Sequence, residues 1–120
     1  MKFDIPGRLP GTNEIIDAAK RGDGKYQPYA IMKDQYTDIV AWLAKKLPKY
    51  NKIDITITWY EPNANRDPDN IMGGQKFILD GLVRAGTIPN DTQKYIGDIT
   101  HRIRVDRKDP RVEVEIEEVT

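Results

Sequence analysis

The spacing of apolar positions changes along the 120-residue chain, and each spacing predicts a different element. From Ile53 to Trp59, apolar and polar side chains alternate, which is typical of a strand with one buried face. The same alternation recurs at 99–105 and 112–117, and the short connection between these segments predicts an antiparallel hairpin. In that hairpin, the outward arginines of the first strand would face the outward glutamates of the second. Residues 2–5 are consistent with one further short strand.

Two other segments have the three-and-four spacing of a helical face. The first runs over 29–47, where Pro28 suits the first turn and Pro48 stops the helix. The second runs over 69–85 and ends before Gly86, which suits the position just after a helix. The segment before residue 28 is interrupted by prolines and glycines and is expected to be long and mobile.

These elements predict an α+β fold in a single domain over 1–120, in the order β-α-β-α-β-β. The expected architecture is a small mixed or antiparallel sheet of about four strands with two helices packed on it. No apolar run approaches the roughly 20 residues needed to span a bilayer, so no membrane association is expected. The N-terminus lacks an apolar signal region and cysteine is absent, which favours the cytoplasm.

Composition narrows the possible chemistry. The chain contains neither cysteine nor serine, which excludes thiolate zinc sites and serine triads. Its formal net charge is zero and its pI is near 6.6, so a site for a polyanion must come from local placement of basic residues. No motif for an organic cofactor is present.

The most informative local pattern is the acidic pair Asp67 and Asp69 where a polar loop enters the second helix. Two carboxylates this close repel each other unless a divalent cation neutralises them, and Mg²⁺ binds through one or two carboxylates, water and phosphate. The alternative is structural, with Asp67 as the N-cap and Asp69 as a partner of the helix dipole. A calcium loop is excluded because Ile71 occupies the next ligand position.

Two further polar residues follow this pair. Lys76 lies two helical turns after Asp69, where its ammonium group can meet a phosphate or simply pair with Asp80 four residues later. Asp91 follows the end of the helix, where a turn residue is the simpler interpretation. Spacing by itself does not decide between these alternatives.

Taken together, Arg66-Asp67-x-Asp69-Asn70, Lys76, the block 77–86 and Asn90-Asp91 resemble the RusA family of Holliday-junction resolvases. The early segment 9–13 is also similar to the family's N-terminal proline-asparagine segment. This chain has about three more residues before Lys76 than the shorter family members, including Gly73-Gly74. The resemblance implies a RusA-like fold in a homodimeric endodeoxyribonuclease that cuts four-way DNA junctions with Mg²⁺, or with Mn²⁺ in its place.

The resemblance also implies roles for individual residues. Asp67, Asp69 and Asp91 would form the catalytic cluster that holds the metal, and Lys76 would assist catalysis. For contact with DNA, we expect a basic arm together with residues beside the acidic pair. The expected DNA-contacting residues are Asn13, Lys20, Arg21, Lys25, Arg66 and Asn70.

Three aromatic residues have competing interpretations. Tyr26 and Tyr29 lie near the basic arm, where they can stack on bases or pack in the core. His101 falls on the apolar face of its strand and is expected to be a core histidine with a hydrogen-bond partner.

The expected catalytic cluster raises a geometric difficulty. A continuous helix over 69–85 would be about 24 Å long, whereas residues 86–91 span at most about 20 Å. Either the helix is shorter or kinked at Gly73-Gly74, or Asp91 comes from the partner in a symmetric dimer. A second functional hypothesis is a catalytically silent nucleic-acid-binding or assembly protein, in which the acidic loop serves only as cap and turn.

Overall fold

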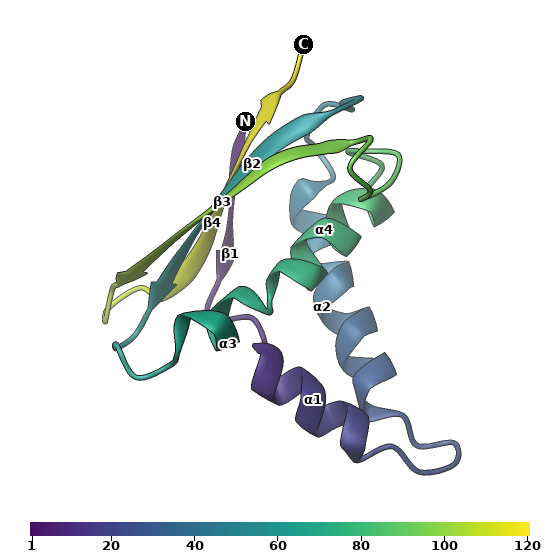
Figure 1. The fold of residues 1–120 in the computed structure, drawn as a ribbon, viewed down its shortest axis with the longest axis vertical. Helices are drawn as coiled ribbons and strands as arrows, with labels where there is room; N and C mark the ends of the chain where they lie inside the picture. Colours follow the sequence, from purple (N-terminus) through teal and green to yellow (C-terminus); the bar gives the residue numbers. More distant parts are fainter.

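The computed structural model covers residues 1–120 and contains one four-stranded sheet in the order β1-β4-β2-β3 (Figure 1). Strands β2 and β3 are parallel, whereas β4 runs antiparallel to both β1 and β2. The predicted α+β fold with a small mixed sheet is therefore confirmed. The strands are β1 (Lys2–Pro6), β2 (Ile53–Glu61), β3 (Ile96–Val105) and β4 (Arg111–Glu118).

Strand β2 lies between two neighbours and supplies the centre of the core. Its odd-numbered side chains are buried, from Ile53 to Trp59, while the residues between them are only half-buried on the opposite face. Val112, Val114 and Ile116 of β4 are buried on the same face as the β2 isoleucines. The predicted alternation thus marks the side of the sheet that the helices cover.

The predicted antiparallel hairpin is wrong, because β2 lies between β3 and β4. Arg102 and Arg104 therefore do not face the glutamates of β4, although both segments are strands as expected. Glu113 instead pairs with Lys2 at 2.7 Å and with Arg111 at 2.8 Å. The hydrogen bond from Lys2, together with the one from Arg111, lowers the pKa of the Glu113 carboxyl.

Four helices lie on one side of the sheet, with α1 packed on α2 and α3: α1 (Thr12–Lys20), α2 (Pro28–Ala44), α3 (Pro68–Met72) and α4 (Gln75–Arg84) (Figure 1). Helix α1 lies in the segment that was expected to be mobile. The helix is amphipathic and Ala18 is completely buried, but it is only nine residues long and follows directly on Pro10 and Gly11. Tertiary contacts, rather than sequence pattern, account for this helix.

Helices α2 and α4 pack closely against each other. A side chain in place of the hydrogen of Gly81 would overlap Val40, so the glycine permits the close approach of the two helices. Tyr36 and Phe77 extend the contact, with ring centroids 5.6 Å apart. None of the helices combines the length and the apolar character needed to cross a membrane.

The predicted second helix is divided into α3 and α4 by Gly73-Gly74. A side chain at Gly73 would overlap Thr12, and one at Gly74 would press on Trp59 and Leu9. Both glycines therefore lie where other parts of the chain approach the backbone. The break separates the five-residue helix α3 from α4, which packs along α2.

Candidate active site

Asp67 and Asp69 lie at the start of α3, after the loop that leaves β2. Asp67 occupies the N-cap position with extended backbone angles, but its side chain makes no capping hydrogen bond. Both residues are exposed, and neither carboxylate forms an ion pair within the chain. Both carboxylates of this acidic pair are thus free of partners within the chain. Carboxylate oxygens of this kind are the ligands that Mg²⁺ takes from proteins.

The N-terminal segment docks directly on the acidic pair. The Thr12 hydroxyl donates to the carbonyl oxygen of Asp69 at 3.3 Å, and the backbone N–H of Asn13 donates to Oδ1 of Asn70 at 2.9 Å. A side chain at Gly11 would overlap the carbonyl of Asn70. The two segments that resemble the family's motifs, 9–13 and 66–70, are therefore in contact.

Arg66 connects the loop before α3 to α1 and β2 through ion pairs. Its guanidinium pairs with Glu14 at 3.0 Å and with Glu61 at 3.4 Å, and its side chain is 13% exposed. Arg8 also pairs with Glu61 at 2.8 Å. Arg66 was an expected DNA contact, but its guanidinium is already paired with two carboxylates of this chain. These ion pairs join α1, β2 and the loop before α3.

Sequence reasoning missed the role of Glu61. Its side chain is buried, with 4% of the residue exposed, and two arginines neutralise it. The available signal was the alternation of β2, which continues from Trp59 to Glu61 and so places Glu61 on the buried face. A carboxylate at such a position requires a cationic partner.

Lys76 lies in the first turn of α4 and is exposed. Its ammonium nitrogen is 3.7 Å from Oδ2 of Asp80, which is the four-residue pairing considered as the simpler alternative. Lys33 of α2 approaches the same oxygen to 3.9 Å. Asp80 therefore holds two ammonium groups from two helices, both at ion-pair rather than hydrogen-bond distance.

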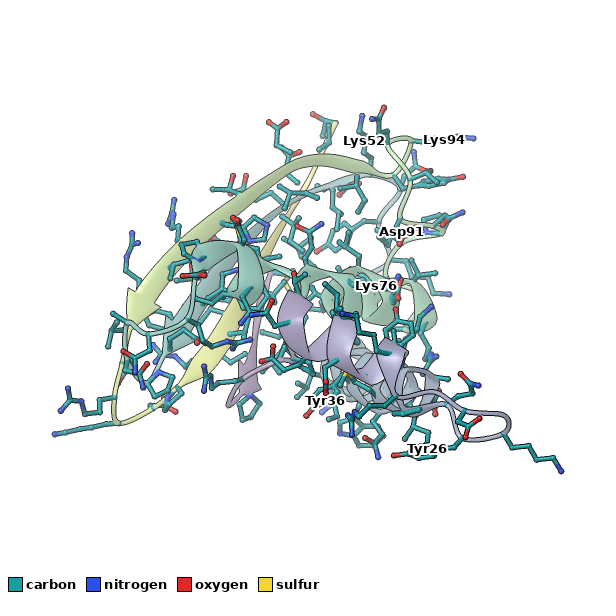
Figure 2. All side chains as sticks on the ribbon, turned by 60° about the horizontal axis from the view of Figure 1, so that its bottom comes forward. Tyr26, Tyr36, Lys52, Lys76, Asp91 and Lys94 are labelled. Atoms are coloured by element: carbon teal, nitrogen blue, oxygen red, sulfur yellow. The ribbon has the colours of Figure 1, made fainter.

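Asp91 lies in the loop beyond α4, on the same side of the molecule as Lys76 (Figure 2). It is exposed and lines a hollow together with Asn90, Arg84 and Asp80 of the α4 side. Thr37 of α2 also lines this hollow; it is buried, and its hydroxyl has no hydrogen-bond partner. Asp91 is thus associated with α2 and α4 rather than with α3.

The structure divides the expected catalytic set between two places. Asp67 and Asp69 lie at the start of α3, whereas Lys76 lies in the first turn of α4 and Asp91 in the loop after α4. No group of three or more carboxylate, histidine or cysteine side chains in the chain is arranged to hold a metal ion. The break at Gly73-Gly74 is present but does not bring Asp91 to the pair, so an arrangement in which a partner subunit supplies Asp91 stays a prediction.

The basic arm lies at the end of α1 and in the loop that follows. Lys20 and Lys25 are exposed, as is Arg21, which pairs with Asp17 at 3.1 Å. Tyr26, in the protruding loop between α1 and α2, is 56% exposed (Figure 2), whereas Tyr29 is half-buried. Of the two tyrosines, Tyr26 is the one placed for contact with a ligand.

His101 has the expected hydrogen-bond partners but is half-buried rather than in the core. The indole N–H of Trp59 donates to Nδ1 of His101 at 2.9 Å, so Nε2 carries the proton and donates to Oε1 of Gln75 at 2.8 Å. Burial lowers the pKa of the imidazole, which favours this neutral tautomer. The histidine joins β2, β3 and α4.

No protein-family model matches the chain, and no curated protein matches it significantly.

Proposed function

We propose that this protein is a Mg²⁺-dependent, structure-selective endodeoxyribonuclease that cuts four-way DNA junctions in the cytoplasm during recombination and repair. The observation that carries the proposal is the pair of exposed, unpaired carboxylates of Asp67 and Asp69 at the start of α3. Hydrogen bonds from Thr12 to the carbonyl of Asp69 and from Asn13 to Asn70 join the start of α3 to α1. Exposed, unneutralised carboxylates two residues apart are suited to binding a hard cation.

In this proposal, Asp67, Asp69 and Asp91 hold the metal, with Mn²⁺ able to replace Mg²⁺. The bound ion supplies a Lewis acid that lowers the pKa of water and stabilises the charge that develops on the phosphate. Asn70 keeps the acidic pair oriented through its bond to Asn13. Lys76 adds positive charge near the phosphate, and its loose contact with Asp80 leaves the ammonium free to move toward an anion.

A homodimer fits both the protein and its substrate. Because the chain does not gather the three aspartates by itself, the partner's Asp91 completes each site. A two-fold dimer presents two equivalent sites, which matches two junction strands of like polarity. For binding the backbone, Lys20 and Lys25 are the available cations of the basic arm, with Tyr26 exposed beside them.

Two observations favour the silent nucleic-acid-binding module instead. The chain has zero net charge and no cluster of three metal-binding side chains. Thermal unfolding in the presence of metal separates the two functions, because an ion that binds only the folded protein raises Tm. Millimolar Mg²⁺ or Mn²⁺ is expected to raise Tm of the native protein and to leave that of Asp67→Asn/Asp69→Asn unchanged. An equal response of both proteins would favour the silent module.

The deciding experiment is cleavage of a labelled synthetic four-way junction beside a linear duplex of the same sequence. Each is incubated with Mg²⁺, with Mn²⁺ and with a chelator. We expect paired, metal-dependent nicks confined to the junction. Equal cutting of both substrates would indicate a general nuclease, and binding without cutting would indicate the silent module.

A further inference from the structure

Strand β3 forms one edge of the sheet, and that edge is open. It is ten residues long, Ile96–Val105, and packs extensively only on β2. An edge of this length exposes a row of backbone N–H and C=O groups that can pair with another strand. The opposite edge is β1, which has five residues and ends in Pro6, so it is short and blunted.

The β3 edge is regular from Ile99 to Val105, beyond a register shift near its start. It contains neither proline nor lysine. Its outward charged residues Asp98, Arg102 and Arg104 are exposed, and none of them forms an ion pair within the chain. Elsewhere in the sheet Glu113 and Arg111 are paired, whereas Glu115 and Glu117 of β4 are also without an ion pair. The unpaired charges on β3 are therefore available to another molecule.

Backbone direction defines which residues of β3 would make the new hydrogen bonds. The N–H of Asp106 donates to the carbonyl of Glu61 in β2 at 2.8 Å, and the N–H of Asp98 also points toward β2, to Oδ1 of Asp54. The register with β2 shifts between Ile96 and Ile99, and beyond this shift successive residues point their backbone groups in opposite directions, so the odd-numbered residues there present theirs to the open edge. Ile99, His101 and Ile103 thus have free N–H and C=O groups.

We propose that two copies of this chain pair antiparallel through β3, about a two-fold axis at His101, to form one continuous eight-stranded sheet. In this register, Asp98 of each subunit lies opposite Arg104 of the other, which places opposite charges together twice. Ile99 lies opposite Ile103 of the partner subunit on the face covered by the helices. Both isoleucines are only half-buried in one chain, so the pairing extends the apolar core across the interface.

This arrangement also brings together the two halves of the candidate active site, a consequence that rests on the proposed function. The C-terminal end of β3 shares a hollow with Pro68 and Ile71 of α3, directly beside Asp67 and Asp69. Asp91 instead precedes the N-terminal end of β3. Antiparallel pairing places the N-terminal end of one β3 next to the C-terminal end of the other. A two-fold axis perpendicular to the sheet keeps both helical layers on one face, so the partner's Asp91 approaches the α3 side.

Disulfide trapping tests the register directly, because the chain has no cysteine of its own. Directly opposed residues of the pairs not joined by hydrogen bonds have Cα atoms about 4.5 Å apart, within the range of a disulfide. We expect a mixture of Asp98→Cys and Arg104→Cys proteins to form a covalent dimer on oxidation. Asp98→Cys alone should not, because its two copies lie six positions apart along the strand, about 20 Å. Asp98→Cys mixed with Asp4→Cys, on the β1 edge, is the matched control.

A charge exchange tests the same contact without oxidation. Sedimentation equilibrium should show a dimer of twice 13.8 kDa. Arg104→Asp should raise the dissociation constant about tenfold or more, because it opposes two carboxylates at each of the two contacts. The double variant Asp98→Arg/Arg104→Asp should restore it to near the native value. Both residues are exposed and unpaired in the chain, so these variants should fold.

Three results would overturn the interface: a monomer at all concentrations, a dimer without the 98–104 disulfide, or a dimer indifferent to the charge exchange. None of these measurements uses metal or DNA. If the disulfide forms but junctions are not cut, the interface stands and the proposed function fails. If junctions are cut but the disulfide does not form, the proposed function stands and the interface fails.

Discussion

Asn70 accepts a hydrogen bond through Oδ1 from the backbone N–H of Asn13, 2.9 Å away and 57 positions earlier in the chain. Asn13 lies in the first turn of α1, whose N-cap, Gly11, has no side chain to satisfy the free N–H groups there. Asn70 therefore caps α1 from another part of the chain. The same hydrogen bond fixes the side chain of Asn70, the residue that follows the acidic pair, against α1.

Replacing this cap should weaken the fold locally. Asn70→Ala is expected to lower the free energy of unfolding by about 1 kcal/mol, as for the loss of other N-terminal caps. Asn70→Asp keeps an oxygen acceptor and should lose less. Chemical denaturation measures the difference, and amide exchange at Asn13 should accelerate in the alanine variant only. Equal protection of Asn13 in both variants would contradict the capping role.

Removing either carboxylate of the acidic pair should reduce junction cleavage without changing the stability of the fold. Asp67→Asn and Asp69→Asn should each reduce junction cleavage on the order of a thousandfold, because metal binding supplies several kcal/mol of charge stabilisation. Tm in the absence of metal should be unchanged, since neither carboxylate makes a hydrogen bond or an ion pair within the chain. Junction affinity, measured without metal, should persist. Asp4→Asn, an exposed carboxylate on β1, is the control, and full cleavage by Asp67→Asn would contradict the assignment.

Mixing two inactive variants tests whether the partner subunit supplies Asp91. Asp67→Asn and Asp91→Asn homodimers should both be inactive. A heterodimer of the two should contain one intact site, built from Asp67 of one chain and Asp91 of the other, so co-refolded mixtures should regain junction nicking. A site assembled within one chain would leave every subunit of the mixture defective. Persistent inactivity of a verified heterodimer would therefore exclude the shared site.

His101 should make stability depend on pH just below neutrality. Burial lowers its pKa in the folded protein from the ordinary value of 6.5, so the unfolded chain takes up the proton first as pH falls. The free energy of unfolding should therefore be highest above about pH 6.5 and decline toward the lowered pKa. Urea denaturation between pH 7.5 and 5.5 measures this trend.

His101→Gln is the control for this trend and should flatten it. Asp106 and Glu113 do not interfere, because hydrogen bonds from Arg111 to Asp106 and from Lys2 to Glu113 lower the pKa of each carboxyl and keep both ionised in this range. An unchanged pH profile in His101→Gln would show that another group is responsible.

Several features of the fold were predictable from local pattern. The alternation from Ile53 to Trp59 predicted a buried strand, and Pro28 and the apolar spacing that follows predicted α2. The partner of β3 was not predictable, because alternation identifies the buried face of a strand but carries no information about its neighbour. The short loop after Val105 favoured a hairpin, yet β2 takes the central position.

Parts of the candidate site were likewise predictable from the sequence, and other parts were not. The acidic pair and the break at Gly73-Gly74 were visible as residue types at given positions. The contacts that hold the pair were not visible, since Asn13 and Asn70, or Arg66 and Glu14, are far apart in sequence. Helix α1 was missed because it is only nine residues long, lies between Gly11 and Gly22, and takes its cap from the distant Asn70.

The sequence by itself determined which segments form the sheet, which of their faces is buried, and where two carboxylates stand beside a helix start. These properties depend on residue type and on spacing within a few positions, through backbone geometry and the burial of apolar side chains. Only the tertiary structure decided that β3 is an open edge, that Arg66 forms ion pairs within the chain, and that Asp91 lies apart from Asp67. Those properties depend on contacts between distant segments, whose pairing is selected by the packing of the whole core.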